Sequence, residues 1–143
     1  MSYAFDAGSI LILTRELGER VLDVVGGNST ASLAYYEAGN ALWKECNLLA
    51  RLGVDEAAKA LEFTISLLSF MEVIQLKDEN LGVRTLFNAF KLNITYYDAA
   101  YLSVAEDLGK VLVTDDEKLA TAAKEIGVKT LSSRSFIQEQ NMI

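Results

Sequence analysis

The chain of 143 residues has a net charge of −7, contains no His and has one Cys, Cys46. This composition excludes an intrachain disulfide, a Cys-based zinc site and the usual Ser-His-Asp and Cys-His catalytic arrangements. The acidic balance also argues against a nucleic-acid substrate, because phosphate contacts need Lys and Arg. Carboxylates that surround a metal ion, however, count as negative only until the ion binds.

In the first half of the chain, short apolar runs alternate with longer helical patterns. An apolar run that ends at Asp6 predicts the first strand, and the helical period after it breaks near Gly18. We expect Gly53 to end the longest helix and Asp55 to cap the start of the next one. The expected elements are a strand at 1–5, a helix at 9–25, a strand at 31–34, and helices at 35–52 and 55–70.

The second half continues the alternation. Apolar Val73, Ile74 and Leu76 in an alternating stretch predict a third strand, and the apolar run before Thr114 is the clearest buried strand. Gly127 is expected to end a helix. The expected elements are a strand at 72–76, helices at 79–91 and 96–108, a strand at 110–113, a helix at 117–126, a strand at 128–131 and a helix at 135–141.

Strands that alternate with helices predict a parallel sheet covered by helices on both faces. We therefore expect one three-layer α/β/α domain over residues 1–143, with a mainly parallel sheet of roughly five strands. In such folds, ligands bind outside the carboxyl ends of the strands. Asp6, Asp115 and Asp116 directly follow expected strands and should lie at that edge. Glu37 and Asp98 stand in the first turns of helices and reach the edge only if those helices begin there.

The acidic residues at these positions are candidate ligands for a hard divalent cation, which prefers oxygen donors. Each also has an ordinary structural interpretation. Asp6 could cap a helix, Thr95 and Asp98 resemble a capping box, and Glu37 could pair with Lys44 on an exposed helix face. Acids in the first turn of the helix at 117–126 favour the helix dipole without any further role. Taken together, in a chain without competing catalytic residues, they indicate a metal site.

The segments that carry these acids resemble, in order, the four motifs of the PIN-domain ribonucleases. The segments are residues 3–7, 37–43, 97–102 and 112–119. The resemblance runs from Tyr3 to about Leu131, and the compact size is most similar to the VapC-type toxins of toxin–antitoxin pairs. The motifs around Asp98 and Thr114 are the most specific.

The resemblance implies which residues form the site. The metal-binding and catalytic acids would be Asp6, Glu37, Asp98 and Asp116. Asp115 fills the variable place of the Thr-x-Asp motif and could substitute or assist, Thr114 would steady the cluster, and Asn40 matches a polar neighbour of the second acid. One departure is Gly8, where many family members have a small hydroxyl residue; Ser9 follows it.

The resemblance also implies a Mg²⁺- or Mn²⁺-dependent endoribonuclease that acts on RNA, forms a homodimer and pairs with an antitoxin protein. Two carboxylates about 4 Å apart repel by roughly 4 kcal/mol at an effective dielectric near 20, so a cation would stabilise the cluster. We expect Asp6 and Asp98 to be direct ligands, Glu37 and Asp116 to complete a second ion or bind through water, and Glu37 to be able to accept a proton from water.

Substrate contacts need cations. The candidates are Arg15, Arg20, Lys44, Arg51, Arg84, Lys91, Lys110 and Lys118. Only Lys44 and Lys118 lie within one or two helical turns of an acidic motif.

Three other classes of protein can be compared with this chain by the residues that they need. A phosphoacceptor receiver domain needs an acidic pair after the first strand and an Asp after the third, but here the third strand runs into Gln75, Leu76 and Lys77. A haloacid-dehalogenase-type phosphatase needs a second Asp two places after Asp6, where Gly8 stands. The remaining alternative is a non-catalytic PIN-like module that only binds RNA or protein.

Nothing in the sequence predicts export or membrane insertion. Asp6 lies inside the first apolar run without a positively charged leader, so we expect no signal peptide. The longest apolar stretch, residues 63–70, is too short to span a bilayer. We therefore expect a cytoplasmic protein with no membrane partner, in which Cys46 is a small buried hydrophobic side chain.

Overall fold

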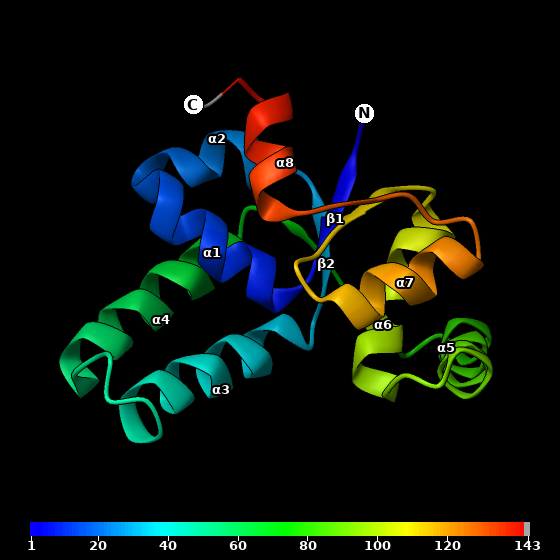
Figure 1. Cartoon of the computed structure of the whole chain (residues 1–143), viewed down its shortest axis with the longest axis horizontal. Coiled ribbons are helices and arrows are strands. Elements are labelled where there is room, and N and C mark those ends of the chain that lie inside the picture. The colour runs from blue at the N-terminus through cyan, green and yellow to red at the C-terminus, as the bar shows by residue number, and fades with distance from the viewer. Residues whose placement is uncertain (142–143) are drawn as a thin grey trace.

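The computed structural model describes residues 1–141 and has a five-stranded sheet with the strand order β3-β2-β1-β4-β5 (Figure 1). The strands are β1 (Tyr3–Phe5), β2 (Ser29–Ala31), β3 (Glu72–Ile74), β4 (Val111–Val113) and β5 (Thr130–Leu131). All neighbouring strands pair in parallel. The predicted three-layer α/β/α fold is confirmed.

Helices cover both faces of the sheet (Figure 1). On one side lie α1 (Ala7–Leu17), a 3₁₀ turn (Gly18–Arg20), α2 (Val21–Val25), α3 (Ala34–Asn47), α4 (Val54–Leu68) and α8 (Ser133–Glu139). On the other side lie α5 (Glu79–Leu92), α6 (Tyr96–Leu108) and α7 (Glu117–Glu125). The antiparallel helices α3 and α4 pack on each other and extend away from the sheet (Figure 1).

The core forms around the two central strands, β1 and β4, whose side chains are all buried. Phe136 of α8 packs edge-on against the rings of Tyr3 and Phe5, at centroid distances of 4.8 and 5.1 Å. These aromatic contacts fix α8 to the sheet through dispersion and edge-to-face electrostatics. On the opposite face, α6 lies against β1, β2 and β4, and its residues 99–105 are all buried.

Several predicted boundaries are confirmed and others are wrong. The break at Gly18 and the helices at 79–91 and 96–108 agree with the structure to within a residue. The second strand lies at 29–31 rather than 31–34, because polar Ser29 and Thr30 are buried in it with bonded hydroxyls. Thr30 Oγ1, for example, donates to the Phe5 carbonyl at 2.7 Å. An apolar run therefore does not mark this strand.

The helix expected at 35–52 ends at Asn47, which corrects two further expectations. Ala50 has a positive φ of 50°, so the chain leaves the helix before Gly53. Gly53 is instead the N-cap of α4, and Asp55 lies in the first turn rather than at the cap. Cys46 is half-buried, with its Sγ 3.6 Å from the Gly53 carbonyl oxygen, and not fully buried as predicted.

Among the helices of residues 1–141, none combines the length and the apolar character needed to cross a membrane.

Candidate functional site

Asp6 lies at the carboxyl end of β1 and begins the site. Its Oδ1 accepts a hydrogen bond from the Ser9 backbone N–H at 2.8 Å, so Asp6 is the N-cap of α1. Its Oδ2 accepts from the Thr114 hydroxyl. Asp6 is only 8% exposed, and this burial raises the pKa of its carboxyl group, against the lowering effect of the bonds from Thr114 and Ser9. The capping interpretation is therefore correct, yet the carboxylate also faces the cavity described below.

Thr114 connects the ends of the two central strands. Its hydroxyl donates to Asp6 and accepts from the Asp116 backbone N–H at 3.1 Å. Asp116 in turn caps α7, because its Oδ1 accepts from the Leu119 N–H at 2.9 Å. The Thr114 hydroxyl thus has both its donor and an acceptor position occupied, and it ties the end of β4 to the end of β1.

Asp115 and Asp116 are neighbours in sequence but have different contacts. Both oxygens of Asp115 accept from Ser133, Oδ1 from the backbone N–H at 3.0 Å and Oδ2 from the hydroxyl. Ser133 is the first residue of α8, so Asp115 holds that helix in place. Asp116 uses only Oδ1 in its described hydrogen bonds.

Asp98 lies in the first turn of α6, where Thr95 is the N-cap and accepts from the Asp98 N–H at 3.0 Å. The described hydrogen bonds include none from the Thr95 backbone back to the Asp98 carboxylate, so only half of the predicted capping box forms. Desolvation, followed by the charge of Asp116, raises the pKa of Asp98. The carboxylate of Asp98 lines the cavity, and the Thr95 hydroxyl partly lowers its pKa.

Glu37 reaches the same place from the first turn of α3. Its Oε1 accepts a hydrogen bond of 2.7 Å from the hydroxyl of Tyr101, a residue of α6 that is 64 positions away in the sequence. Desolvation raises the pKa of Glu37, the bond from Tyr101 lowers it, and the charges of Asp98 and Asp6 raise it. Burial and the bond to Glu37 raise the pKa of the Tyr101 phenol far above its ordinary value.

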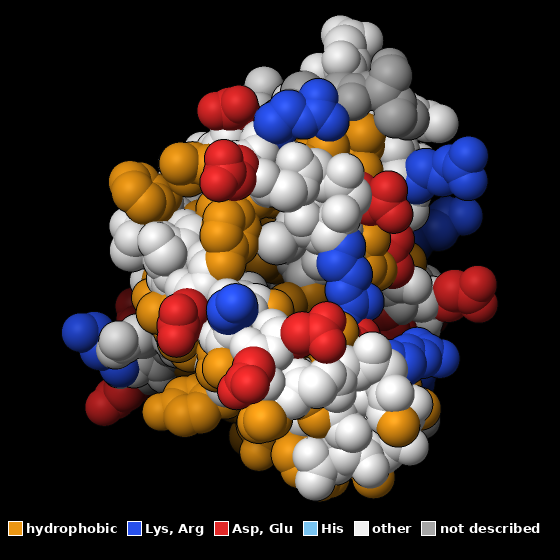
Figure 2. Space-filling model, turned by 90° about the vertical axis from the view of Figure 1, so that its left-hand side faces the viewer, with side chains coloured by type: hydrophobic (Ala, Val, Ile, Leu, Met, Phe, Trp, Pro, Cys, Tyr) orange, Lys and Arg blue, Asp and Glu red, His pale blue; other side chains and the backbone are white. Residues whose placement is uncertain are grey.

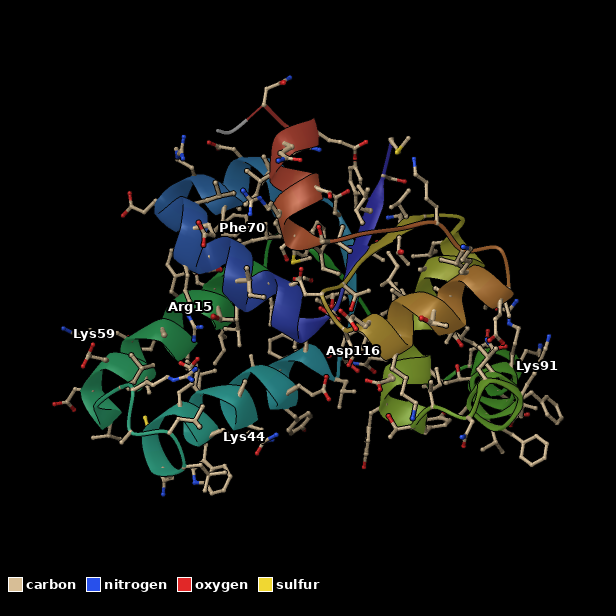
Figure 3. All side chains as sticks on the ribbon, in the orientation of Figure 1. Arg15, Lys44, Lys59, Phe70, Lys91 and Asp116 are labelled. Carbon is tan, nitrogen blue, oxygen red and sulfur yellow. The ribbon has the colours of Figure 1, made fainter. Side chains whose placement is uncertain are left out.

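These side chains line one cavity of about 240 Å³ at the carboxyl edge of the sheet. The lining residues are Asp6, Gly8, Ser9, Ile12, Glu37, Asp98, Tyr101, Asp115 and Asp116. Figure 3 shows Asp116 near the starts of α1, α3 and α7, where the cavity opens. The structure therefore brings all five predicted acids together, and Thr114 lies buried directly behind them.

The donor chemistry of the cavity fits a hard divalent cation, because five carboxylates supply oxygen atoms and no nitrogen or sulfur ligand is present among its lining residues. Burial raises the pKa of three of these acids, which means that protein groups do not fully replace the water lost around their carboxylates. In residues 1–141, however, no three acidic side chains stand close enough together to hold one metal ion. The hydrogen bonds at Asp6, Asp115 and Asp116 keep these carboxylates at their separate elements.

A second, shallower hollow of about 200 Å³ adjoins the cavity and shares Gly8 and Glu37 with it. Asn40 and Lys44 of α3 line this hollow, so Asn40 lies beside Glu37 but not in the acidic cavity itself. The charge of Lys44 lowers the pKa of Glu37, and the charge of Lys118 lowers that of Asp98. The two cations nearest the acidic motifs therefore come from different helices, Lys44 from α3 and Lys118 from α7.

Two residues of the site were not predicted, Tyr101 and Ser133. Tyr101 follows Asp98 by three positions and so shares its helix face, a signal that could have indicated it. The partners of both hydroxyls are far away in sequence, at Glu37 and Asp115. Ser9, which follows the departure at Gly8, is fully buried and its hydroxyl donates to backbone carbonyls of Asp6 and Val113 at 2.9 and 3.0 Å. Ser9 thus joins β1 to β4 beneath the cavity.

No protein-family model matches the chain. Two curated proteins of Pyrobaculum aerophilum are similar to it in sequence. The exonuclease VapC9 is 44% identical over 109 residues, which cover 74% of this chain and 75% of that protein. The ribonuclease VapC3 is 34% identical over 129 residues, which cover 84% of this chain and 93% of that protein.

Solved structures agree with these sequence relatives. The crystal structure of PAE2754 from Pyrobaculum aerophilum is 27% identical, with a TM-score of 0.79 over 100% of this chain and 91% of that one. A toxin–antitoxin complex from Klebsiella pneumoniae has the same fold, with a TM-score of 0.63 at 16% identity over 92% of this chain and 98% of that one. Together with the acidic motifs in one cavity, the sequence relatives show that the chain belongs to the VapC family of PIN-domain ribonucleases.

Proposed function

We propose that this protein is a Mg²⁺- or Mn²⁺-dependent endoribonuclease that hydrolyses RNA phosphodiester bonds, and that it is the toxin of a toxin–antitoxin pair. The observation that carries the proposal is the single cavity into which separate elements deliver five carboxylates. The two sequence relatives are named as a ribonuclease and an exonuclease, which supports hydrolysis of nucleic acid.

The ion would be held by Asp6 and Asp98, with Glu37 and Asp116 completing its surroundings. The chemistry that such an ion supplies is a lower pKa for a coordinated water and neutralisation of charge on the scissile phosphate. Glu37 is the acid we propose to accept a proton from the attacking water, because it is not one of the two direct ligands and the described hydrogen bonds engage only its Oε1. Thr114 orients Asp6 by donating to it.

We assign the fourth acidic position to Asp116 and a structural role to Asp115. Both oxygens of Asp115 are occupied by Ser133, and breaking these bonds would release the start of α8. Asp116 uses one oxygen as a helix cap, which leaves the other for a ligand. Replacing Asp116 by Asn would therefore reduce activity, whereas replacing Asp115 by Asn would mainly reduce stability.

Lys44 and Lys118 are the proposed contacts to RNA phosphates, because their charges act on Glu37 and Asp98 of the cavity. Three of the other candidate cations already have partners. The ion pairs are Arg15 with Glu45, Arg84 with Asp107, and Lys110 with Glu72. Among the described residues, neither Lys44 nor Lys118 forms an ion pair, so both remain available to a substrate.

A second candidate function is exonuclease activity, because the relative that is 44% identical carries that name. A closed circular RNA distinguishes the two, since it has no end and only an endonuclease can open it. The third possibility is the non-catalytic PIN-like binding module, which would bind RNA or protein without cutting.

The test is cleavage of linear and circular RNA of mixed sequence by the purified protein in Mn²⁺, with EDTA and Asp98→Asn as controls. We expect both RNAs to be cut in Mn²⁺ and neither to be cut in either control. Cleavage of linear RNA alone would favour the exonuclease. Binding without cleavage would favour the binding module, and cleavage that survives EDTA would contradict a metal-dependent mechanism.

Exposed apolar surface supports the proposed protein partners, a second copy of the chain and an antitoxin. On the outer face of α5, four large apolar side chains follow helical spacing and are at least half exposed. They are Val83, Leu86, Phe87 and Phe90. The face toward the α3–α4 hairpin also shows hydrophobic side chains among charged ones (Figure 2). Light scattering of wild type and Phe90→Glu tests the dimer, which should dissociate in the variant.

A further inference from the structure

Tyr101 occupies an unusual place in the cavity, because it is the one aromatic residue among the lining side chains and is only 2% exposed. It projects from α6, on the same helix face as Asp98. Its hydroxyl donates to Glu37 Oε1 at 2.7 Å, so one side chain joins the first turn of α6 to the first turn of α3.

The Glu37 side chain lies between two recesses and can point into either of them. It lines both the acidic cavity and the neighbouring hollow that contains Asn40 and Lys44. Lys44 would attract a carboxylate into the hollow, while the charges of Asp98 and Asp6 repel it from the cavity. A glutamate side chain is also flexible, so holding it in one rotamer costs conformational entropy.

Tyr101 supplies the opposing constraint. Its ring is rigid and buried, and a hydrogen bond to a charged acceptor is stronger than one between neutral groups. The described hydrogen bonds engage only Oε1 of Glu37, so the second carboxylate oxygen stays free of protein donors. The Tyr101 hydroxyl therefore holds Glu37 toward the acidic cavity and leaves the second carboxylate oxygen free to bind a ligand.

We propose that Tyr101 is a positioning residue that holds Glu37 toward the acidic cavity and away from Lys44. The inference rests on the proposed function, because its consequence is a Glu37 carboxylate prepared for a divalent ion and for the water beside it. Residues that hydrogen-bond to metal-binding side chains and orient them typically contribute about 10- to 100-fold to metal affinity or activity.

The test uses Tyr101→Phe, which removes only the hydroxyl. We expect its affinity for Mn²⁺, measured by the loss of the free-ion electron paramagnetic resonance signal, to fall about 10-fold or more. For RNA cleavage we expect a similar fall in kcat with little change in KM, since the hydroxyl does not contact the substrate strand. Tyr97→Phe, the same change on the exposed face of α6, is the matched control and should match wild type.

Two further variants separate positioning from a structural role. In a Glu37→Gln background, Tyr101→Phe should have no additional effect on Mn²⁺ affinity, because the residue it acts through has been neutralised. Incorporation of para-aminophenylalanine at position 101 keeps an N–H donor in place of the hydroxyl, and should restore most of the affinity. This variant also preserves the size of the side chain if Tyr101→Phe folds poorly.

The outcomes distinguish a failure of the proposed nuclease function from a failure of the role inferred for Tyr101. Wild-type protein that neither binds Mn²⁺ nor cleaves RNA would overturn the proposed function and the inference with it. Wild-type protein that does both, with Tyr101→Phe within twofold of it, would overturn only the inference. Additive losses in the Glu37→Gln background would likewise overturn it, because Tyr101 would then act through some other group.

Discussion

Mn²⁺ is expected to stabilise the folded protein, and Asp98→Asn is expected to remove most of that stabilisation. Burial and neighbouring charges raise the pKa of Asp6, Glu37 and Asp98, so ionising them in the fold costs free energy at neutral pH. A bound cation offsets that cost. The amide of the variant removes a charge and one oxygen of the proposed ligand set together, so binding of the ion should weaken.

The size of the effect follows from linkage and chain length. At a free Mn²⁺ concentration about 100 times the Kd, binding adds about 2.7 kcal/mol to the free energy of unfolding. An unfolding entropy of about 2.1 cal/mol/K per residue gives about 0.3 kcal/mol/K for 143 residues, and hence a rise in Tm of about 9 °C. If Asp98→Asn weakens binding about 100-fold, the remaining rise is about 1 °C.

Scanning calorimetry with and without Mn²⁺, near neutral pH, measures these shifts. Asp55→Asn is the matched control, because Asp55 is an exposed acid in the first turn of α4 and far from the cavity. Its Mn²⁺ shift should equal that of wild type. A wild-type Tm that does not respond to Mn²⁺, or an Asp98→Asn shift as large as that of wild type, would refute the reasoning. Equal losses in both variants would mean that Mn²⁺ acts on surface charge in general.

Four further outcomes are expected. In EDTA, Asp98→Asn should gain stability relative to wild type as the pH rises from about 4. The reason is that folded Asp98, with its raised pKa, still holds a proton that the unfolded chain has released at the ordinary pKa of 3.8. Urea melts across pH measure this difference in stability, and a flat or falling difference contradicts it. Lys44→Ala and Lys118→Ala should each raise KM for RNA with little change in kcat, and lower the slope of log affinity against log salt by about one. Thr114→Val should lower Mn²⁺ affinity about 10- to 100-fold, while Thr114→Ser keeps it, as titration calorimetry would show. Phe136→Ala should cost about 3–5 kcal/mol in a denaturant melt, since its ring is fully buried against two other aromatic rings; a cost below about 1 kcal/mol would mean that α8 is not part of the core.

The elements with chemical signals at both ends were predictable from the sequence. The helix at 96–108 has Thr95 as an N-cap and Gly109 in the left-handed region at its end, and both ends agree with the structure. The end of α3 was not predictable, because the residues after Asn47 are compatible with a helix. Only the positive φ of Ala50, which no local pattern indicates, shows where the chain turns.

The acids of the site were predictable for a similar reason, and their supports were not. Asp6 directly follows β1 and Asp116 comes three positions after the end of β4, so a parallel sheet brings them to one edge. The hydroxyl of Tyr101 has its partner 64 residues away, and its role depends on how α3 and α6 approach each other. Tertiary packing of this kind has no periodic signature in the sequence.

The order of the strands explains why the acids crowd at this particular point. From β1 the chain moves outward to β2 and β3, and after β4 it moves the other way to β5. The connections that leave β1 and β4 therefore diverge, with α1 on one face of the sheet and α7 on the other (Figure 1). Such a divergence leaves a crevice at the carboxyl ends of the two central strands.

That crevice has two physical properties at once. Its floor is the buried end of the sheet, where Asp6 is almost fully removed from solvent, whereas its rim is open enough that Asp116 remains exposed. Carboxylates on the floor lose hydration and acquire raised pKa values, while those on the rim keep ordinary access to water. The proposed divalent cation would therefore enter from solvent at the rim and be held by acids whose burial the fold alone does not offset. The cost of burying the acids and the ion binding proposed for them thus have the same origin, the reversal of strand order between β1 and β4.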